Sequence, residues 1–300
     1  MPDYENTGCI FATFWETPTL IEPGGLGGSN WSPMPYSPDT GYFYLPGTLR
    51  PSSYVRYGDT YKKGLRYVGG TQAPPIGAPL AGDFTAIDSK TNKIVWQQQM
   101  PYRMGGGGGS TVTAGGLLLR GEPDGNFVAL HARTGDVLWK FQTGFGADAP
   151  PMVYEVDGKE YIAIVTGGNS VQGSANGDAL WAFSLNGQIS PLWPPPPPLT
   201  VARPVGPIID GADKVKIADL NAEYAYFPGR ARVKKGTTVT FTNMGDLPHT
   251  ATAVATDKLK WDTGPLAKGE SKSITFTAPG DHYYICTIHP WMYGVVYVDP

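Results

Sequence analysis

The sequence predicts an all-β fold in two parts. Three observations predict it: aromatic-rich segments separated by turn residues, a repeated strand-turn-strand unit, and a proline run that divides the chain. Gly (40) and Pro (29) make up almost a quarter of the 300 residues, about twice their average share. Because 12% of the residues are aromatic and the net charge is only −3, we interpret this composition as frequent turns between strands rather than disorder.

The charge balance limits the function classes. Charged residues make up 16% of the chain, below the ~25% of average domains. The sequence therefore lacks the excess of basic residues that would indicate a nucleic-acid partner. No apolar run approaches the ~18 residues of a membrane span, and residues 1–6 lack the pattern of a signal peptide. On this evidence either the chain is cytoplasmic or its true N-terminus lies elsewhere. Two cysteines, Cys9 and Cys286, make no disulfide framework, and Cys9 has no assigned role.

The first predicted domain, residues 1–190, contains a repeated unit. Ala86–Trp96 (AIDSKTNKIVW) matches Ala129–Trp139 (ALHARTGDVLW) at an offset of 43 residues, and Tyr36–Leu45 contains a shorter relative. Each unit predicts two strands joined by a tight turn. Because a period of ~40–45 residues is typical of propeller blades, this domain is expected to hold about four blades, including partial ones.

A predicted linker, residues 191–211, follows this domain. Its five consecutive prolines, Pro194–Pro198, favour stiff polyproline II and cannot join the interior of a sheet. We therefore expect a semi-rigid spacer, with a surface loop inside one domain as the alternative. The linker separates residues 1–190 from a second predicted domain, residues 212–300.

The second domain contains the donor types of a copper site. Cys286, His289 and Met292 are spaced three residues apart, and His249 lies 37 residues before Cys286. A thiolate, two imidazoles and a thioether form the soft set that selects copper, and a trigonal His₂Cys site with a weak axial Met serves electron transfer. Zinc would favour four strong ligands without a thioether. A catalytic cysteine would need neither Met292 nor His249.

The other two histidines are expected outside this site. The chain has only four histidines, which excludes a multicopper oxidase. His282 lies beside Asp281 and Tyr283, and we expect it on the surface. His131 lies where the sister repeat has Asp88, so we expect it to cap that turn.

Residues 212–300 resemble a cupredoxin, closest to amicyanin in the length of the ligand loop. The segments that carry the likeness are Val233–Asn243, Pro248–Thr250, Gly269–Phe276, Tyr284–Cys286 and Gly294–Val298. The resemblance implies a β-sandwich that binds type 1 copper through His249, Cys286 and His289, with Met292 as the long axial ligand. It also implies that His289 is the partly exposed ligand through which electrons pass, inside an apolar rim of Pro290 and Trp291.

Residues 20–187 resemble the C-terminal half of pyrroloquinoline quinone (PQQ)-dependent alcohol dehydrogenases. The likeness rests on Gly27-Gly-Ser-Asn-Trp31, the paired repeats, Ala149–Pro151 and Tyr154–Tyr161. The family folds as an eight-bladed β-propeller that binds PQQ with Ca²⁺ or a lanthanide on its axis, so this chain is expected to form a partial propeller, about half of one. In the family the Asn-Trp pair approaches the quinone, which implies that Asn30 and Trp31 bind the cofactor. The alternative is an Asn in a turn and a Trp in the core.

Two departures from the family affect this expectation. Methanol-oxidising members of the family have a Trp just ahead of a Gly-Gly-Thr motif, and this chain has Gly105–Gly109 at that place. The five glycines predict either a close approach of the backbone to a ligand or a mobile loop. The catalytic Asp and the metal-binding residues of the family belong to the N-terminal half, so the catalytic residues are expected on that missing half. Because a propeller closes its ring and so removes exposed sheet edges, we expect a partner that carries the remaining blades, or a longer parent chain.

Together the resemblances imply a function. The chain is expected to be the C-terminal part or a subunit of a PQQ-dependent alcohol dehydrogenase. Its copper domain would accept electrons one at a time from the reduced quinone and pass them to an external acceptor such as a cytochrome. Systems of this kind in the family are periplasmic, which implies export. The alternative is a non-catalytic copper electron-transfer protein whose propeller segment only docks it to a partner.

Overall fold

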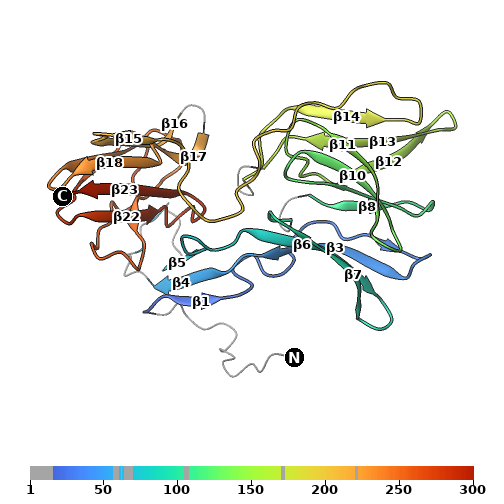
Figure 1. Ribbon diagram of the computed structural model, residues 1–300, viewed down its shortest axis with the longest axis horizontal. Helices are drawn as coiled ribbons and strands as arrows, with labels where there is room; N and C mark the ends of the chain where they lie inside the picture. The colour runs from blue at the N-terminus through green and yellow to red at the C-terminus, as the bar shows by residue number, and fades with distance from the viewer. Residues whose placement is uncertain are drawn as a thin grey trace. The chain divides into compact units, whose positions relative to one another are not determined.

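The computed structural model describes residues 16–56, 61, 63, 70–104, 108–169, 173–219 and 222–300, and all regular elements in these ranges are strands (Figure 1). The predicted all-β class is therefore confirmed. Cys9 and Gly105–Gly107 lie outside the described residues. The chain divides into two compact units. The blade unit comprises residues 22–51 and 75–202, and the sandwich unit comprises residues 1–21, 52–74 and 203–300.

The blade unit contains three antiparallel sheets whose strands follow one another in chain order. The first is built from β2 (Tyr36–Ser37), β3 (Tyr42–Leu49), β6 (Ala81–Asp88) and β7 (Ile94–Met100). The second is built from β8 (Ser110–Val112), β9 (Leu117–Gly121), β10 (Asn126–His131) and β11 (Val137–Gln142). The third has three strands, β12 (Met152–Val156), β13 (Lys159–Thr166) and β14 (Ala179–Phe183). This arrangement is propeller-like, and the expected count of about four blades stays a prediction.

The three sheets stack on one another through apolar faces. Leu118 and Leu119 are adjacent on β9, so their side chains point to opposite faces of the second sheet. Leu118 lies in a buried cluster with Tyr44 and Phe84 of the first sheet. Leu119 lies in a second cluster with Ile164 of the third sheet. The second sheet is therefore buried on both faces.

The repeated unit forms a contact between the first two sheets. The Trp96 indole donates a hydrogen bond from Nε1 to the Ala132 carbonyl oxygen, 3.3 Å away. Its ring covers Gly135, where a Cβ atom would lie 2.9 Å from Trp96 Cδ2. Gly135 also has a φ of +79°, which L-residues adopt at a cost. The glycine of one repeat therefore provides the surface on which the tryptophan of the preceding repeat packs.

The Tyr36–Leu45 segment differs from the two longer repeats in its place in the sheet. Its turn joins β2 and β3, the first two strands of a sheet, whereas the turns of the longer repeats join the third and fourth strands. The shared turn residues therefore reflect a common turn geometry and not a third copy of the same unit.

The predicted linker, residues 191–211, is attached to the blade unit over its first part. The Leu192 amide donates to the Gln142 carbonyl at 2.9 Å, and the Leu80 amide donates to the Thr200 carbonyl at 2.9 Å. A β-bridge joins Pro79 and Val201. Residues 192–202 therefore lie against this unit, which leaves 203–207 before the first strand of the sandwich.

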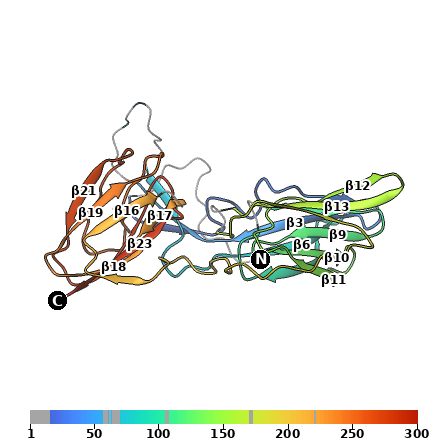
Figure 2. The same ribbon diagram turned by 90° about the horizontal axis from the view of Figure 1, so that it is seen from above.

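The sandwich unit contains two main sheets that face one another (Figure 2). One has the order β15 (Ile208–Asp210), β18 (Arg230–Lys234), β23 (Tyr293–Asp299), β22 (Gly280–Ile285) and β20 (Thr252–Ala253). The other has the order β17 (Ala222–Phe227), β16 (Lys214–Asp219), β19 (Thr238–Asn243) and β21 (Ser271–Thr275). A third sheet in this unit, which the sequence did not predict, joins β1 (Thr19–Ile21), β4 (Ser52–Arg56) and β5 (Gly70–Ala73).

An aromatic core fills the sandwich. Tyr284 is fully buried, and its ring centroid lies 4.7 Å from Tyr226, 5.4 Å from Phe241 and 5.4 Å from Trp261. Gly294 lies directly beneath Tyr284, because a Cβ atom there would be 2.1 Å from Tyr284 Cζ. These rings occupy the same buried cluster as Cys286 and Met292.

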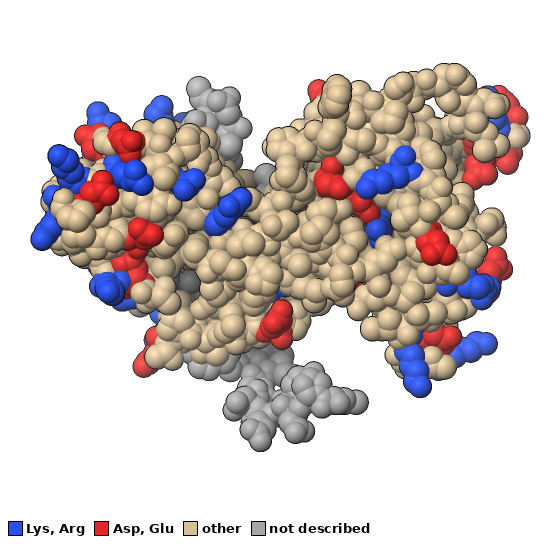
Figure 3. Space-filling model, viewed as in Figure 1, with Lys and Arg blue, Asp and Glu red and all other residues tan. Residues whose placement is uncertain are grey.

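The surface carries no large field of one sign on the face that Figure 3 shows, because acidic and basic side chains are interspersed there. This distribution agrees with the small net charge of −3.

Candidate metal centre

Two loops of the sandwich bring the predicted donors together. Cys286 follows the last residue of β22, and Met292 precedes the first residue of β23. The loop between them is closed by hydrogen bonds from the Cys286 amide to the Met292 carbonyl (3.3 Å) and from the Met292 amide to the His289 carbonyl (3.0 Å). His249 comes from the loop between β19 and β20, where it forms a β-bridge with Leu266.

The donor atoms of three residues converge on one point. His249 Nδ1 lies 3.8 Å from Cys286 Sγ, and His289 Nδ1 lies 3.6 Å from the same sulfur. The two Nδ1 atoms are 3.0 Å apart. All three residues are buried, with exposures of 0% for His249 and Cys286 and 8% for His289. The group can therefore hold one metal ion, as the sequence predicted.

Burial and hydrogen bonds act in opposite directions on the Cys286 thiol. Burial raises the pKa of the Cys286 thiol, while hydrogen bonds from the backbone amides of Thr250, His289 and Ile288 lower it. The Thr250 amide donates to Sγ at 3.3 Å. A thiolate is the metal-binding form of cysteine, and a metal ion supplies the positive charge that an isolated buried thiolate lacks.

Asn243 and Thr250 fix the loop that carries His249. The buried Asn243 amide donates from Nδ2 to the carbonyls of Leu247 (2.7 Å) and Leu266 (2.8 Å). Thr250 Oγ1 accepts a hydrogen bond from the Thr287 amide at 2.9 Å, which ties the His249 loop to the Cys286 loop. Such outer contacts hold ligand side chains in one orientation.

Met292 supplies a thioether on the same loop as Cys286 and His289. It is 2% exposed and lies in the same core cluster as Cys286. Two imidazole nitrogens and one sulfur converge in a buried site with a thioether on the same short loop, which is the composition of electron-transfer copper sites. The residues present therefore fit a copper ion better than zinc, which favours four strong ligands.

Aromatic rings surround the histidines on the outer side of the site. The Tyr224 ring lies 5.1 Å from His289, 6.4 Å from His249 and 5.5 Å from Trp291, and Trp291 lies 5.5 Å from His289. His289 is the more exposed of the two histidines. At 8% exposure it is nevertheless buried, and the expected role as a partly exposed ligand that passes electrons stays a prediction.

Comparison with known proteins assigns both parts of the chain. Residues 48–162 match the model of the glucose/ethanol/alcohol dehydrogenase β-propeller domain, the PQQ domain. Residues 213–299 match the model of copper-binding proteins of the plastocyanin/azurin family. The chain thus joins a segment similar to the PQQ propeller domain to a segment similar to plastocyanin/azurin-type copper-binding proteins.

The relatives of the propeller segment are quinoprotein alcohol dehydrogenases. The quinoprotein ethanol dehydrogenase of Pseudomonas putida is 36% identical over 191 residues, which cover 59% of this chain and 29% of that protein. The solved quinohemoprotein alcohol dehydrogenase ADHIIG of P. putida HK5 superimposes with a TM-score of 0.54 at 26% identity, covering 63% of this chain and 31% of that one. The chain spans about three tenths of the length of the curated relatives it matches.

A solved structure of reduced amicyanin is also similar to the copper-binding domain. It is 35% identical, covers 30% of this chain and 83% of that one, and has a TM-score of 0.27.

The expected surface position of His282 is wrong. His282 is 3% exposed on β22, where its Nδ1 lies 3.0 Å from the buried Asp257 Oδ1 and its Nε2 donates to the Ala278 carbonyl at 2.8 Å. The sequence places it among polar neighbours, but strand alternation turns it inward toward Phe276, 5.5 Å away. His131, by contrast, is exposed, and its Nδ1 lies 3.3 Å from Thr134 Oγ1 within the turn, as predicted.

Asn30 and Trp31 lie in a loop of the blade unit, before β2. Asn30 Nδ2 donates to the Leu26 carbonyl at 3.0 Å, and Asn30 Oδ1 accepts from the Trp31 amide at 2.9 Å. Trp31 is 72% exposed, so it does not belong to the core of the described residues. The predicted contact of this pair with a quinone stays a prediction.

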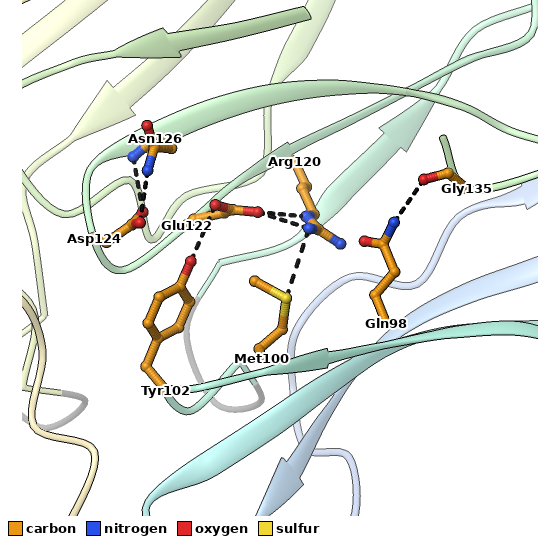
Figure 4. A network of polar contacts seen from close by, with 8 residues as sticks. All are labelled: Gln98, Met100, Tyr102, Arg120, Glu122, Asp124, Asn126 and Gly135. Atoms are coloured by element: carbon orange, nitrogen blue, oxygen red, sulfur yellow. Dashed lines mark hydrogen bonds and ion pairs between the residues drawn. The ribbon is translucent and has the colours of Figure 1, made fainter. Parts of the chain in front are cut away.

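A buried polar network in the propeller segment was not predicted from the sequence (Figure 4). Arg120 and Glu122 form an ion pair at 2.6 Å with exposures of 3% and 4%, and Tyr102 donates to Glu122 Oε2 at 3.0 Å. Burial raises the pKa of Tyr102, which keeps its hydroxyl a donor. The Arg120 guanidinium also lies 4.6 Å from the Phe84 ring centroid. Arg120 is on β9, and Glu122 follows the last residue of that strand, so strand alternation alone does not predict that the two side chains meet.

Asp148 lies close to this network. It lines a small cavity together with Phe84, Gly109 and Arg120. Burial raises the pKa of the Asp148 carboxyl, and a hydrogen bond from the Ser174 hydroxyl together with the charge of Arg103 opposes that shift.

Proposed function

We propose that this chain is the C-terminal part or a subunit of a PQQ-dependent alcohol dehydrogenase in which the copper-binding domain carries electrons away from the quinone. It would accept them one at a time and pass them to an external acceptor such as a cytochrome. The observation that carries the proposal is the convergence of His249, Cys286 and His289 in a copper-binding domain that shares its chain with a PQQ-propeller segment.

The residues of the copper-binding domain have distinct proposed roles. His249, Cys286 and His289 would hold the copper ion, and Met292 would be the long axial ligand. The ion, when bound, supplies a one-electron redox couple. Electrons would pass through the edge of His289, because it is the more exposed histidine and lies beside Trp291.

The propeller segment would contribute to the quinone site of a complete propeller. Asn30 offers an amide for hydrogen bonds to the cofactor, and Trp31 offers an apolar wall. PQQ, with Ca²⁺ or a lanthanide as Lewis acid, supplies the two-electron chemistry of alcohol oxidation when bound. The catalytic Asp and the ligands of that metal would come from the remaining blades, on a partner chain or on a longer parent chain.

The proposed location is the periplasm, where related systems of this kind act. The described residues include no helix with the length and hydropathy needed to cross a membrane. Because the chain covers about three tenths of its curated relatives, a second function deserves a test, in which the propeller segment only docks a non-catalytic copper protein to a partner.

The test follows the copper during alcohol oxidation. The Cu(II)-loaded chain is mixed, without oxygen, with a polypeptide that supplies the remaining blades and is loaded with PQQ and Ca²⁺, and ethanol is then added. Loss of the blue copper absorbance only when all components are present supports the proposal. Reduction of an added dye while the copper stays oxidised would contradict the role of the domain as electron acceptor. Copper reduction by a complete quinoprotein, with no contribution from the propeller segment, would favour the docking function.

A further inference from the structure

Tyr224 contacts the candidate metal centre from a strand that carries none of its donors. It lies on β17 (Ala222–Phe227), whereas His249, Cys286 and His289 come from two loops of the sandwich. The centroid of its ring lies 5.1 Å from that of His289 and 6.4 Å from that of His249, and both contacts are edge-to-face. One ring therefore lies against both of the imidazoles whose nitrogens converge.

The exposures of these side chains place the Tyr224 ring between the donors and the solvent. Tyr224 and Trp291 are partly exposed, whereas His289 is 8% exposed and His249 and Cys286 are 0% exposed. The rings of Tyr224 and Trp291 lie 5.5 Å apart, and Trp291 lies 5.5 Å from His289. His289 is therefore buried because rings from two separate elements of the sandwich cover it.

A buried tyrosine on the same strand fixes the position of Tyr224. Tyr226 is two residues further along β17, so its side chain points to the same side of the strand. It is 4% exposed, and its ring centroid lies 4.7 Å from that of Tyr284 in the core. Its hydroxyl donates to the Thr250 carbonyl at 2.6 Å. Because Thr250 directly follows His249, this hydrogen bond ties β17 to the loop that carries one of the donors.

A fixed apolar ring in this position controls what reaches a metal ion held by the three donors. The apolar shell around a metal site limits the access of solvent and lowers the local dielectric constant, which sets the redox potential. Low dielectric disfavours net charge. With a thiolate as ligand, Cu(I) gives a centre without net charge and Cu(II) gives one with a single positive charge. The ring would therefore favour the reduced state and keep water and small anions away from the ion.

We propose that Tyr224 is a positioning residue that closes the metal centre to water and small anions and holds the imidazole of His289 in place. A centre closed in this way can pass electrons but offers no open position to a substrate. This inference rests on the proposed function, since it assumes a copper ion that carries electrons. The cover that Tyr224 forms over His289 does not depend on the ion, and it can be measured separately.

The first test measures the cover over His289 in the metal-free full-length chain. The chain is treated with diethylpyrocarbonate, which modifies accessible imidazoles, and the rate at each histidine is followed by mass spectrometry. His131 is exposed and His282 is 3% exposed, so these two residues give the fast and the slow limit in the same molecule. In the wild type, His289 should react about as slowly as His282.

Three variants separate the Tyr224 ring from general effects on the strand. Tyr224→Val removes the ring but keeps a β-branched side chain that suits a strand, and its His289 should react nearly as fast as His131. Tyr224→Phe retains the ring and should restore the slow reaction. Tyr297→Val is the matched control, because Tyr297 is also a partly exposed tyrosine of the sandwich but contacts two arginines instead of the metal centre.

The second test uses the same proteins loaded with Cu(II). Sodium azide should change the visible absorbance of Tyr224→Val and leave that of the wild type and of Tyr297→Val unchanged. Tyr224→Val should also bind copper about tenfold more weakly in competition with EDTA. In a fixed mixture of ferricyanide and ferrocyanide, the ratio of reduced to oxidised copper should be lower in Tyr224→Val than in the wild type. A merely structural contribution of Tyr224 to the strand would not move this ratio.

Equal reactivity of His289 in the wild type and in Tyr224→Val would overturn the inference, and so would an unchanged response of the copper to azide and to the redox mixture. If His282 in Tyr224→Val reacts as fast as His131, that variant is unfolded, and Tyr224→Leu, which keeps more apolar volume, replaces it with the same expectations. A wild type that shows the slow reaction at His289 but no blue band after copper loading would contradict the proposed function alone.

Discussion

Replacing Gly135 with alanine should lower the free energy of unfolding of the blade unit. The decrease should exceed the cost of placing a Cβ atom on the backbone conformation of Gly135. The φ of +79° imposes about 1–2 kcal/mol on any L-residue with a Cβ atom. The new Cβ would also lie 2.9 Å from Trp96 Cδ2, so the indole must move.

Movement of the indole adds a second contribution. It weakens the hydrogen bond to the Ala132 carbonyl, worth about 1 kcal/mol. It also disturbs the ring contacts with Tyr44 and Phe84, whose centroids lie 6.0 and 6.1 Å away. Together with the cost of the backbone conformation, these effects should lower the free energy of unfolding by about 2–4 kcal/mol.

Gly41→Ala is the matched control for the backbone term. Gly41 has a φ of +74° and no atom within 4 Å of a built Cβ, so its alanine variant should lose only about 1–2 kcal/mol. Asn92, which occupies the corresponding turn of the first repeat with a φ of 56°, shows that a Cβ is tolerated in that conformation.

The assay is urea unfolding of both variants and of Gly135→Ala in a Trp96→Ala background. In the Trp96→Ala background, where the indole is absent, Gly135→Ala should lower the free energy of unfolding by no more than Gly41→Ala does. Equal losses for Gly135→Ala and Gly41→Ala in the wild-type background would refute the packing of Trp96 on Gly135.

Three further predictions concern buried groups. Asp148 has a raised pKa, so its folded carboxyl keeps a proton that the unfolded chain releases; stability should fall as pH rises from the ordinary Asp value through the raised pKa. Asp148→Asn should remove this slope in a pH series of urea unfolding, and an unchanged slope would contradict the assignment. His282→Ala should lower the free energy of unfolding of the sandwich unit by about 1–3 kcal/mol, because the buried Asp257 carboxylate loses its hydrogen bond to the imidazole; a loss below about 0.5 kcal/mol would indicate a surface histidine. Gly294→Ala should lose about 1–3 kcal/mol by displacing the Tyr284 ring, and unperturbed near-ultraviolet circular dichroism would count against this contact.

The convergence of His249, Cys286 and His289 could be predicted from the sequence because the chemistry of this candidate site is concentrated in a few residue types. Three donors lie on one short loop, and only one further histidine of suitable position, His249, is present. The sequence could not show that Asn243 and Thr250 fix that histidine, because Asn243 acts partly through Leu266 and Thr250 acts through Thr287, both far away in the sequence.

The position of His282 could not be predicted because burial depends on the register of its strand. Its neighbours Asp281 and Tyr283 are polar, but the alternation of β22 turns its side chain inward, and its partner Asp257 is 25 residues away. The Arg120–Glu122 pair was missed for a related reason. Charged residues at the end of a strand are usually solvated, and only the packing of Phe84 from another sheet shows that this pair is buried.

The two longer repeats were recognised from the sequence, but the place of the third, shorter segment in its sheet was not. The spacing of Trp96 and Trp139 indicates equivalent strands, and the structure places both on the fourth strand of a sheet. The turn at Asp39–Gly41 has similar residues in a different place, because Asp, Thr and Gly satisfy the same backbone geometry wherever a tight turn is needed.

The visible absorbance of the Cu(II)-loaded chain tests the central claim most directly. The wild type should bind one copper ion and show an intense blue band, and Cys286→Ser should abolish that band. Cys9→Ser, which changes the only other cysteine of the sequence, should leave it unchanged. An intense blue band that persists in Cys286→Ser would contradict the assignment of the site.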